Sequence, residues 1–190
     1  MNARVILGIS GASGAALGLS AARHLVDMGA RVDLVISPAG ERTLAAECGP
    51  GAADRLRAMA ACVHSASDVG ARIASGSAPL AGMIVAPCSM RTLAAVAHGL
   101  DDNLLTRAAG VQLKERRPLI LLAREAPLTL AHLRNMTAVT EMGATVIPPV
   151  PAWYLAPPSL EAATDQIAAR AVDQLRLGGT PRATGWTGEG

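Results

Sequence analysis

Val5-Ile6-Leu7-Gly8-Ile9-Ser10-Gly11-Ala12-Ser13-Gly14-Ala15-Ala16 is the stretch that decides the fold. An apolar run stops at small residues and resumes as an alanine-rich segment, which predicts a buried strand, a tight turn and the start of a helix. The first backbone N–H groups of such a helix have no partner within it, and the helix dipole is positive there. The turn therefore predicts a site for an anion such as phosphate. The same small residues also permit close packing against a neighbouring segment, and that alternative stays open.

The turn departs from the usual dinucleotide-binding pattern. That pattern is GxGxxG, followed about 20 residues later by an acidic residue that holds a ribose hydroxyl. Here the turn reads Gly8-Ile9-Ser10-Gly11-Ala12-Ser13-Gly14, and the next predicted strand, residues 31–36, leads to Ser37 instead of a carboxylate. We therefore expect a phosphorylated ligand, but not NAD bound in the standard way.

Strand and helix patterns alternate along the rest of the chain. Apolar runs predict further strands at 82–86, 118–123 and 145–147, and helical spacing predicts helices at 15–28, 38–48, 52–61, 90–98, 103–114, 129–142 and after Ser159, with a loop after residue 61. This alternation predicts a single-domain, doubly wound α/β fold, Rossmann-like or flavodoxin-like, with a parallel sheet and helices on both faces. We expect this domain over residues 1–177. Residues 178–190 are expected to be a flexible tail unless a ligand or another subunit holds them.

The composition excludes several classes of protein. With 190 residues, 51% apolar and 17% charged, the chain is typical of a globular domain. A net charge of +2 is too small to indicate a nucleic-acid or membrane partner, and no apolar run is long enough to span a bilayer. The three cysteines form no CxxC pair and the N-terminus has no signal-peptide pattern, so we expect a cytoplasmic protein.

Residues that can bind a phosphate or transfer a proton follow the predicted carboxyl ends of the strands, where open parallel sheets bind ligands. In chain order these ends lead to Ser10–Ser13, Ser37, Ser89, Arg124 with Glu125, and Trp153 with Tyr154. Hydroxyls, backbone N–H groups and arginines suit a phosphate, and Glu125 can transfer a proton. Aromatic residues make up only 2% of the chain, so few rings are available to cover a flat cofactor. We expect all of these residues to share one edge of the sheet.

Several candidates have a second interpretation. Glu47 also fits a solvated carboxylate at a helix end, and Lys114, on one helix face with Arg107, also fits a basic residue that complements a helix C-terminus. Cys88 has no identifiable base nearby, which favours a small buried thiol over a nucleophile. The four histidines show no metal-ligand spacing. We expect them at the surface or at helix ends, and we expect no metal site.

Five motifs together resemble those of the UbiX-type flavin prenyltransferases, over residues 4–176. They are Gly11-Ala12-Ser13-Gly14-Ala15, Pro87-Cys88-Ser89-Met90-Arg91-Thr92-Leu93, Leu113-Lys114-Glu115-Arg116-Arg117-Pro118-Leu119, Arg124-Glu125-Ala126-Pro127 and His132-Leu133-Arg134-Asn135-Met136. The resemblance implies an enzyme that joins a dimethylallyl group, from dimethylallyl monophosphate, to N5 and C6 of reduced FMN without a metal. The product, prenylated FMN, would serve a UbiD-type decarboxylase. The resemblance also implies a homo-oligomer such as a dodecamer.

The resemblance also implies roles for individual residues. Contact with FMN is implied for Gly11, Ala12, Ser13, Ser37, Ser89, Met90, Arg91, Thr92, Arg107 and Arg124. Binding of the prenyl phosphate is implied for Lys114, Tyr154 and Arg170, with Trp186 as a further substrate contact. Catalytic roles, including proton movement, are implied for Glu47, Glu125, Lys114 and Ser13.

The chain departs from the family pattern at two places. Members commonly carry an aromatic residue shortly before the segment Ala74-Ser75-Gly76-Ser77, and residues 68–73 contain none, which leaves Trp186 to cover the prenyl chain. Arg91 stands where glycine or lysine is frequent and adds a potential phosphate contact.

Two alternative functions use the same fold. One is a flavin-dependent cysteine decarboxylase, although Pro87-Cys88-Ser89 replaces the Pro-Ala-Ser-Ala-Asn-Thr motif usual there. The other is a non-catalytic flavin carrier, which would have no need of the second phosphate pocket that Lys114, Arg124, Glu125 and Arg170 suggest.

Overall fold

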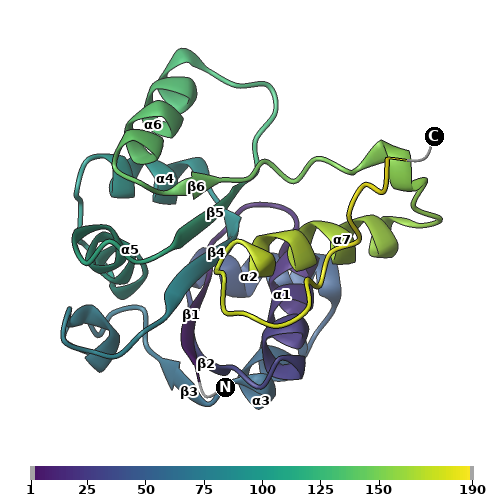
Figure 1. Cartoon of the computed structure of the whole chain (residues 1–190). Coiled ribbons are helices and arrows are strands. Elements are labelled where there is room, and N and C mark those ends of the chain that lie inside the picture. The colour runs from purple at the N-terminus through teal and green to yellow at the C-terminus, as the bar shows by residue number, and fades with distance from the viewer. Residues whose placement is uncertain (1–2, 189–190) are drawn as a thin grey trace.

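The computed structural model describes residues 3–188; residues 1–2 and 189–190, at the ends of the expected domain and tail, lie outside the described residues. Within the described chain six parallel strands form one sheet in the order β3-β2-β1-β4-β5-β6 (Figure 1). The strands are β1 Arg4–Ile9, β2 Arg31–Ile36, β3 Cys62–His64, β4 Gly82–Cys88, β5 Leu119–Ala123 and β6 Thr145–Val146. The order changes direction between β1 and β4, so their carboxyl ends flank the crevice in which open α/β sheets bind ligands.

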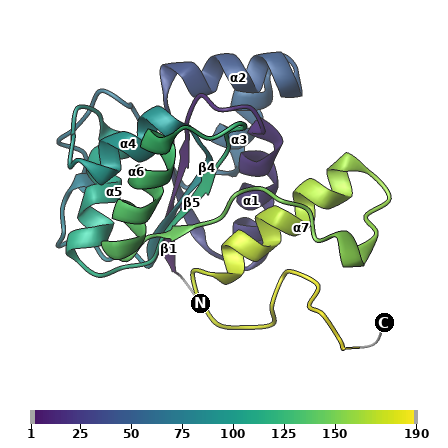
Figure 2. The same cartoon turned by 90° about the horizontal axis from the view of Figure 1, so that it is seen from above.

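Helices cover both faces of the sheet (Figure 2). One layer contains α1 Ala15–Asp27, α2 Pro38–Cys48, α3 Ala52–Met59 and α7 Leu160–Asp173, and the other contains α4 Met90–Ala97, α5 Leu104–Lys114 and α6 Leu130–Glu141. Alternate strand residues feed the two cores: Val5 and Leu7 face α1 and α7, whereas Ile6 faces α5. The doubly wound parallel fold expected from the sequence is confirmed.

The segment after α3 differs from the expectation. It was expected to be a loop, but it contains the edge strand β3 and the short 3-10 helix η1, Arg72–Ala74. The three residues of β3 pair in parallel with β2. A strand this short has no readable alternation of apolar and polar residues, and its pairing with β2 is what defines it.

A buried ion pair ties the first three strands together. Asp33 of β2 is fully buried and accepts hydrogen bonds from Arg4 Nε (2.9 Å) and Nη2 (2.6 Å), and His64 Nε2 of β3 lies 2.9 Å from its Oδ1. The expectation that the histidines lie at the surface or at helix ends is therefore wrong for His64. Asp33, Cys62 and His64 place possible ligand atoms within 4.8 Å of one another, but Arg4 already neutralises the carboxylate. We interpret this group as a structural ion pair.

None of the helices in the described part of the chain has the length and apolar character needed to cross a bilayer.

Candidate active site

Three loops are hydrogen-bonded together at the carboxyl edge of the sheet. The Ser10 hydroxyl donates to the Pro87 carbonyl (2.9 Å) and accepts from the Ser89 N–H (2.7 Å), which joins the ends of β1 and β4. Arg124, directly after β5, donates its backbone N–H to the Cys88 carbonyl (3.1 Å) and its Nε–H to the Ser13 carbonyl (3.2 Å). Of the residues expected to share this edge, Ser10, Ser13, Ser89 and Arg124 are thus brought together from β1, β4 and β5.

The turn after β1 presents backbone donors to this edge. Within residues 3–188, the N–H groups of Gly11, Ala12 and Ser13 donate no hydrogen bond. The same holds for Met90 and Arg91 in the first turn of α4, where the Ser89 side chain accepts only from the Thr92 N–H, at 3.2 Å. Met90 buries its side chain, so a ligand would contact its backbone. Unpaired N–H groups at a helix start fit an anionic group such as the phosphate of FMN.

Close packing also explains the small residues of this turn. A Cβ on Gly11 would lie 2.3 Å from the Ala39 Cβ, and one on Gly40 would lie 2.7 Å from the Ile9 carbonyl oxygen. The turn therefore needs glycine to sit against the start of α2. Ser37 caps that helix by accepting a hydrogen bond from the Gly40 N–H (3.0 Å), and its hydroxyl proton remains available to a ligand. Both interpretations of the turn apply to this molecule.

Glu47 occupies the N-terminus of α1. Its Oε2 accepts hydrogen bonds from the Gly14 and Ala15 N–H groups, each at 2.8 Å. Burial by itself raises the pKa of this carboxyl, but a hydrogen bond from Ser13 and the two N–H groups outweigh that effect. Together with the charge of Arg124 they hold the pKa of Glu47 below its ordinary value. A carboxylate of the chain thus occupies the first N–H groups of α1, and the N–H groups of Gly11 to Ser13 are the ones left for an external anion.

A cavity of 1070 Å³, here called the α1 cavity, opens beside this carboxylate. Ser13, Glu47 and Arg124 line it together with other polar side chains, and apolar side chains such as Leu17, Met59 and Ile167 line much of the rest. A hydroxyl, a carboxylate and a guanidinium thus face one large, mostly apolar space. This combination suits a ligand with both a charged and an apolar part.

A second cavity of 660 Å³, here called the α7 cavity, lies on the other side of Ile167, which lines both. It is lined by Tyr154 and Arg170, and by Trp186 from the tail. The Tyr154 and Trp186 rings meet edge to face, with centroids 5.2 Å apart and planes at 80°. Tyr154 and Arg170, expected to bind the prenyl phosphate, are therefore brought together with Trp186, expected as a further substrate contact.

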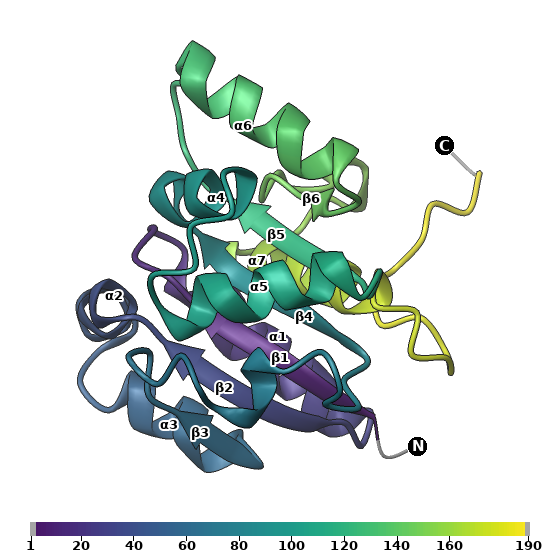
Figure 3. The same cartoon turned by 90° about the vertical axis from the view of Figure 1, so that its left-hand side faces the viewer.

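Lys114 and Arg107 lie elsewhere. Both belong to α5, which covers the face of the sheet opposite α1 and α7 (Figure 3). Lys114 ends α5 at the amino edge of the strands, next to Gly76, and pairs with Glu115, whereas Arg107 pairs with Asp101 at 2.8 Å. Within one chain, α5 therefore keeps these two cations apart from Arg124 and Arg170, and their expected contacts with FMN and the prenyl phosphate stay predictions.

Within the described chain, the side chains of three further candidates, Arg91, Glu125 and Cys88, make only local polar contacts. Arg91 forms an ion pair with Asp102, and Glu125 is exposed and accepts the Ala126 N–H at 3.1 Å. Cys88 is completely buried, and burial raises the pKa of its thiol to about 12. The interpretation of Cys88 as a buried thiol is confirmed.

The sequence analysis missed two polar residues of α7 that line the α7 cavity, Gln166 and Asp173. They stand four residues before and three residues after Arg170, so all three share one face of the helix. That spacing was readable in the sequence. The role of Gln166 and Asp173 could not be read from the sequence, because it depends on the tail, which returns along α7.

Comparison with known proteins identifies the family. The chain matches the family model described as Flavoprotein over residues 1–171. It is 51% identical over 187 residues to the flavin prenyltransferase UbiX of Neisseria meningitidis serogroup B, which covers 97% of each protein. The chain belongs to the UbiX flavin prenyltransferases.

Solved structures of UbiX relatives agree with this assignment. The structure described as AnUbiX (PadA1) in complex with FMN and dimethylallyl pyrophosphate is 42% identical, has a TM-score of 0.95 and covers 100% of both chains. A dodecameric FMN-dependent Ubix-like decarboxylase from Escherichia coli O157:H7 is 40% identical, with a TM-score of 0.91 over 97% of this chain and 99% of that one. The UbiX resemblance inferred from the five motifs is confirmed.

Proposed function

We propose that this flavin prenyltransferase transfers a dimethylallyl group from dimethylallyl monophosphate to N5 and C6 of reduced FMN. One observation carries the proposal: two adjoining cavities separate two sets of anion-binding groups. One set comprises Arg124 and the unpaired N–H groups near the α1 cavity, and the other comprises Arg170 with the Tyr154 hydroxyl in the α7 cavity. Two phosphorylated ligands can therefore be held side by side, which replaces a bimolecular encounter by a positioned reaction.

The flavin end of the site is proposed around the crevice between β1 and β4. The N–H groups of Gly11 to Ser13 and of Met90 and Arg91 would bind the FMN phosphate, with hydroxyls of Ser37, Ser89 and Thr92 nearby. When bound, reduced FMN supplies a nucleophilic nitrogen, N5. Glu47, held ionised by the α1 N-terminus, can accept a proton at the edge of the α1 cavity, where Ser13 also lies.

The prenyl end of the site is proposed in the α7 cavity. Breaking the allylic carbon–oxygen bond leaves a cation-like carbon and a departing phosphate, so a cation and a proton donor must act on the phosphate. Arg170 supplies the charge, and a charge-assisted hydrogen bond to phosphate contributes about 1.5–3 kcal/mol. Glu125 is proposed as the acid that protonates the phosphate, and the rings of Tyr154 and Trp186 can stabilise the cation-like carbon through their faces.

We further propose that the working enzyme is a homo-oligomer such as a dodecamer, in which α5 of one copy approaches the site of another. Lys114 and Arg107 lie across the sheet from both cavities of their own chain, so they can serve a site only between copies. Apolar side chains in and around α6 support such contacts, since Leu130 is 60% exposed and Leu133 48% exposed. The dodecamer named among the relatives supports the same arrangement.

The recipient of the product and the cellular location are also proposals. Prenylated FMN is proposed to pass to a UbiD-type decarboxylase. A cytoplasmic location is supported by the three cysteines, which are all free.

The test is anaerobic incubation with reduced FMN and dimethylallyl monophosphate, followed by mass spectrometry of the released flavin. We expect the flavin to gain one dimethylallyl unit, and to stay unmodified when the donor is left out. Unmodified FMN, recovered although both ligands are shown to bind, would instead favour a flavin carrier or a decarboxylase on the same fold.

A further inference from the structure

Residues 178–186, here called the C-terminal strap, run back along α7 and end at the α7 cavity. Gly178 and Gly179 begin the strap with positive φ values of 87° and 84°, a backbone conformation that favours glycine and turns the chain back. Figure 1 shows this segment beside α7 in yellow. Pro181, Ala183, Thr184, Gly185 and Trp186 line the cavity. The strap therefore forms part of the cavity wall.

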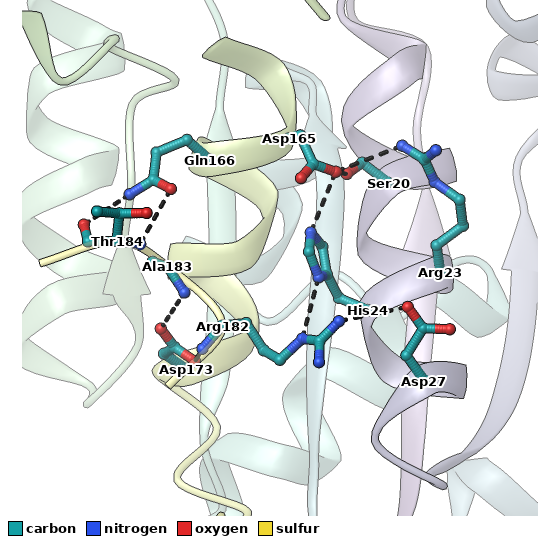
Figure 4. Close-up of polar contacts among 10 residues, drawn as sticks. All are labelled: Ser20, Arg23, His24, Asp27, Asp165, Gln166, Asp173, Arg182, Ala183 and Thr184. Atoms are coloured by element: carbon teal, nitrogen blue, oxygen red, sulfur yellow. Dashed lines mark hydrogen bonds and ion pairs between the residues drawn. The ribbon is translucent and has the colours of Figure 1, made fainter. Parts of the chain in front are cut away.

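Two side chains of α7 tie the strap to the helix (Figure 4). Asp173 accepts the Arg182 N–H at Oδ1 (2.7 Å) and the Ala183 N–H at Oδ2 (3.0 Å). One and a half to two turns earlier, the Gln166 side chain donates to the Thr184 carbonyl (2.8 Å) and accepts its N–H (3.1 Å). Arg170 stands between these two ties on the same helix face. The strap is thus fastened on both sides of the cation proposed to bind phosphate.

A third tie joins the strap to α1. Arg182 donates from Nε to His24 Nδ1 (3.2 Å) and from Nη2 to Asp27 (3.3 Å). Because a guanidinium only donates, His24 Nδ1 is the acceptor and His24 Nε2 carries the proton, which faces Asp165 Oδ1 at 3.1 Å. Figure 4 shows this chain of contacts from the strap through α1 to α7. His24 lies in the last turn of α1, at a helix end as expected, but its side chain is largely buried and connects the strap to α7.

The ties determine where Trp186 stands. Most strap residues are exposed, and polar contacts rather than buried apolar surface hold them. Segments held in this way open at low free-energy cost. Trp186, directly beyond the ties, packs against Tyr154 at the cavity that also contains Arg170.

We propose that Arg182 and Asp173 are positioning residues of the prenyl-transfer reaction: they dock the C-terminal strap on α1 and α7 and thereby hold Trp186 over the prenyl phosphate. Neither residue needs to touch the reacting atoms. The assignment of the ligand rests on the function proposed above, whereas the docking of the strap does not.

The experiment replaces Arg182 in full-length protein that also carries Trp153→Phe, so that Trp186 is the one remaining tryptophan. We expect Arg182→Ala to raise acrylamide quenching of Trp186 and to raise KM for dimethylallyl monophosphate about tenfold, equivalent to about 1.4 kcal/mol, with FMN binding unchanged. Asp173→Ala should give the same pattern. Arg42→Ala, which removes an exposed arginine of α2, is the matched control.

A double-mutant cycle separates positioning from direct contact. If Arg182 acts through Trp186, the variant Arg182→Ala/Trp186→Ala is no more impaired than Trp186→Ala alone. The proposal would be overturned if the losses of the two single variants multiply in the double variant, or if Trp186 is quenched in Arg182→Ala only as much as in the Arg42→Ala control. If the parent protein fails to prenylate FMN, the proposed function fails, and the quenching measurement still decides whether Arg182 docks the strap.

Discussion

Glu47→Gln tests whether the carboxylate at the start of α1 stabilises the fold through its charge. Glu47 Oε2 accepts two backbone N–H groups at 2.8 Å, the role that a capping side chain plays at other helices. Loss of a capping acceptor costs about 0.5–2 kcal/mol, and the interaction of a charge with the helix dipole is worth about 0.3–1 kcal/mol. Because Glu47 is exposed, solvent screening places the expected effects in the lower half of these ranges.

Glu47→Gln and Glu47→Ala should lower the free energy of unfolding by different amounts. Gln keeps a neutral acceptor and loses the charge, so we expect a loss of about 0.5 kcal/mol in the free energy of unfolding. Ala loses the acceptor as well, so we expect about 1 kcal/mol, or a fall in Tm of about 2–4 °C for a chain of this size. Urea and thermal denaturation at one protein concentration measure both values. Glu141→Gln, which removes an exposed carboxylate at the end of α6, is the control.

The stabilisation that Glu47 provides should depend on pH in a definite direction. The pKa of Glu47 is lower in the folded protein than its ordinary value of 4.5, so the ionised carboxylate stabilises the fold above that value. The contribution is lost as the pH falls through the lowered pKa. The difference between the parent protein and Glu47→Gln should therefore be full at pH 7 and shrink below about pH 4.5. A difference that persists undiminished in acid, or no difference at pH 7, would refute the reasoning.

Four further predictions concern other parts of the molecule. Asp33→Asn should cost about 3–5 kcal/mol in urea denaturation, because it leaves the Arg4 guanidinium without its buried partner; a cost below 1 kcal/mol would contradict this. Cys88, buried and with a pKa of about 12, should resist thiol reagents at pH 8 until the protein is unfolded, and rapid labelling of folded protein would argue otherwise. Glu125→Gln should keep FMN binding and lose most prenylation, so unaltered turnover would remove Glu125 from catalysis. Arg170→Ala should raise KM for dimethylallyl monophosphate by about tenfold or more, and an unchanged KM would remove Arg170 from the site.

Much of the fold was predictable because its signals are local. Apolar periodicity located the long helices and the central strands, and side chains such as Ser37, Ser89 and Asn103 cap helices where the sequence suggested. The edge strand β3 was not predictable in the same way. Its three residues are ordered by pairing with β2 and by the contact of His64 with Asp33, thirty-one residues away in the chain.

The candidate site was predictable only in part. Residues that directly follow strands, such as Ser13 and Arg124, meet as expected because all parallel strands end at one edge. Lys114 is the last residue of helix α5, and neither its motif nor its charge reveals which face of the sheet that helix covers. The family resemblance groups it with Arg170, and the fold of one chain separates them.

The sequence by itself determined the α/β alternation, the edge of the sheet that carries the candidate site, and the family, because these depend on residue order and local spacing. Only the tertiary structure decided which side chains complete the site. Glu47 reaches the start of α1 from the end of α2, and Arg182 reaches His24 from 158 residues away. Such contacts depend on how helices pack across the sheet and how the chain end returns, and no short stretch of sequence specifies either.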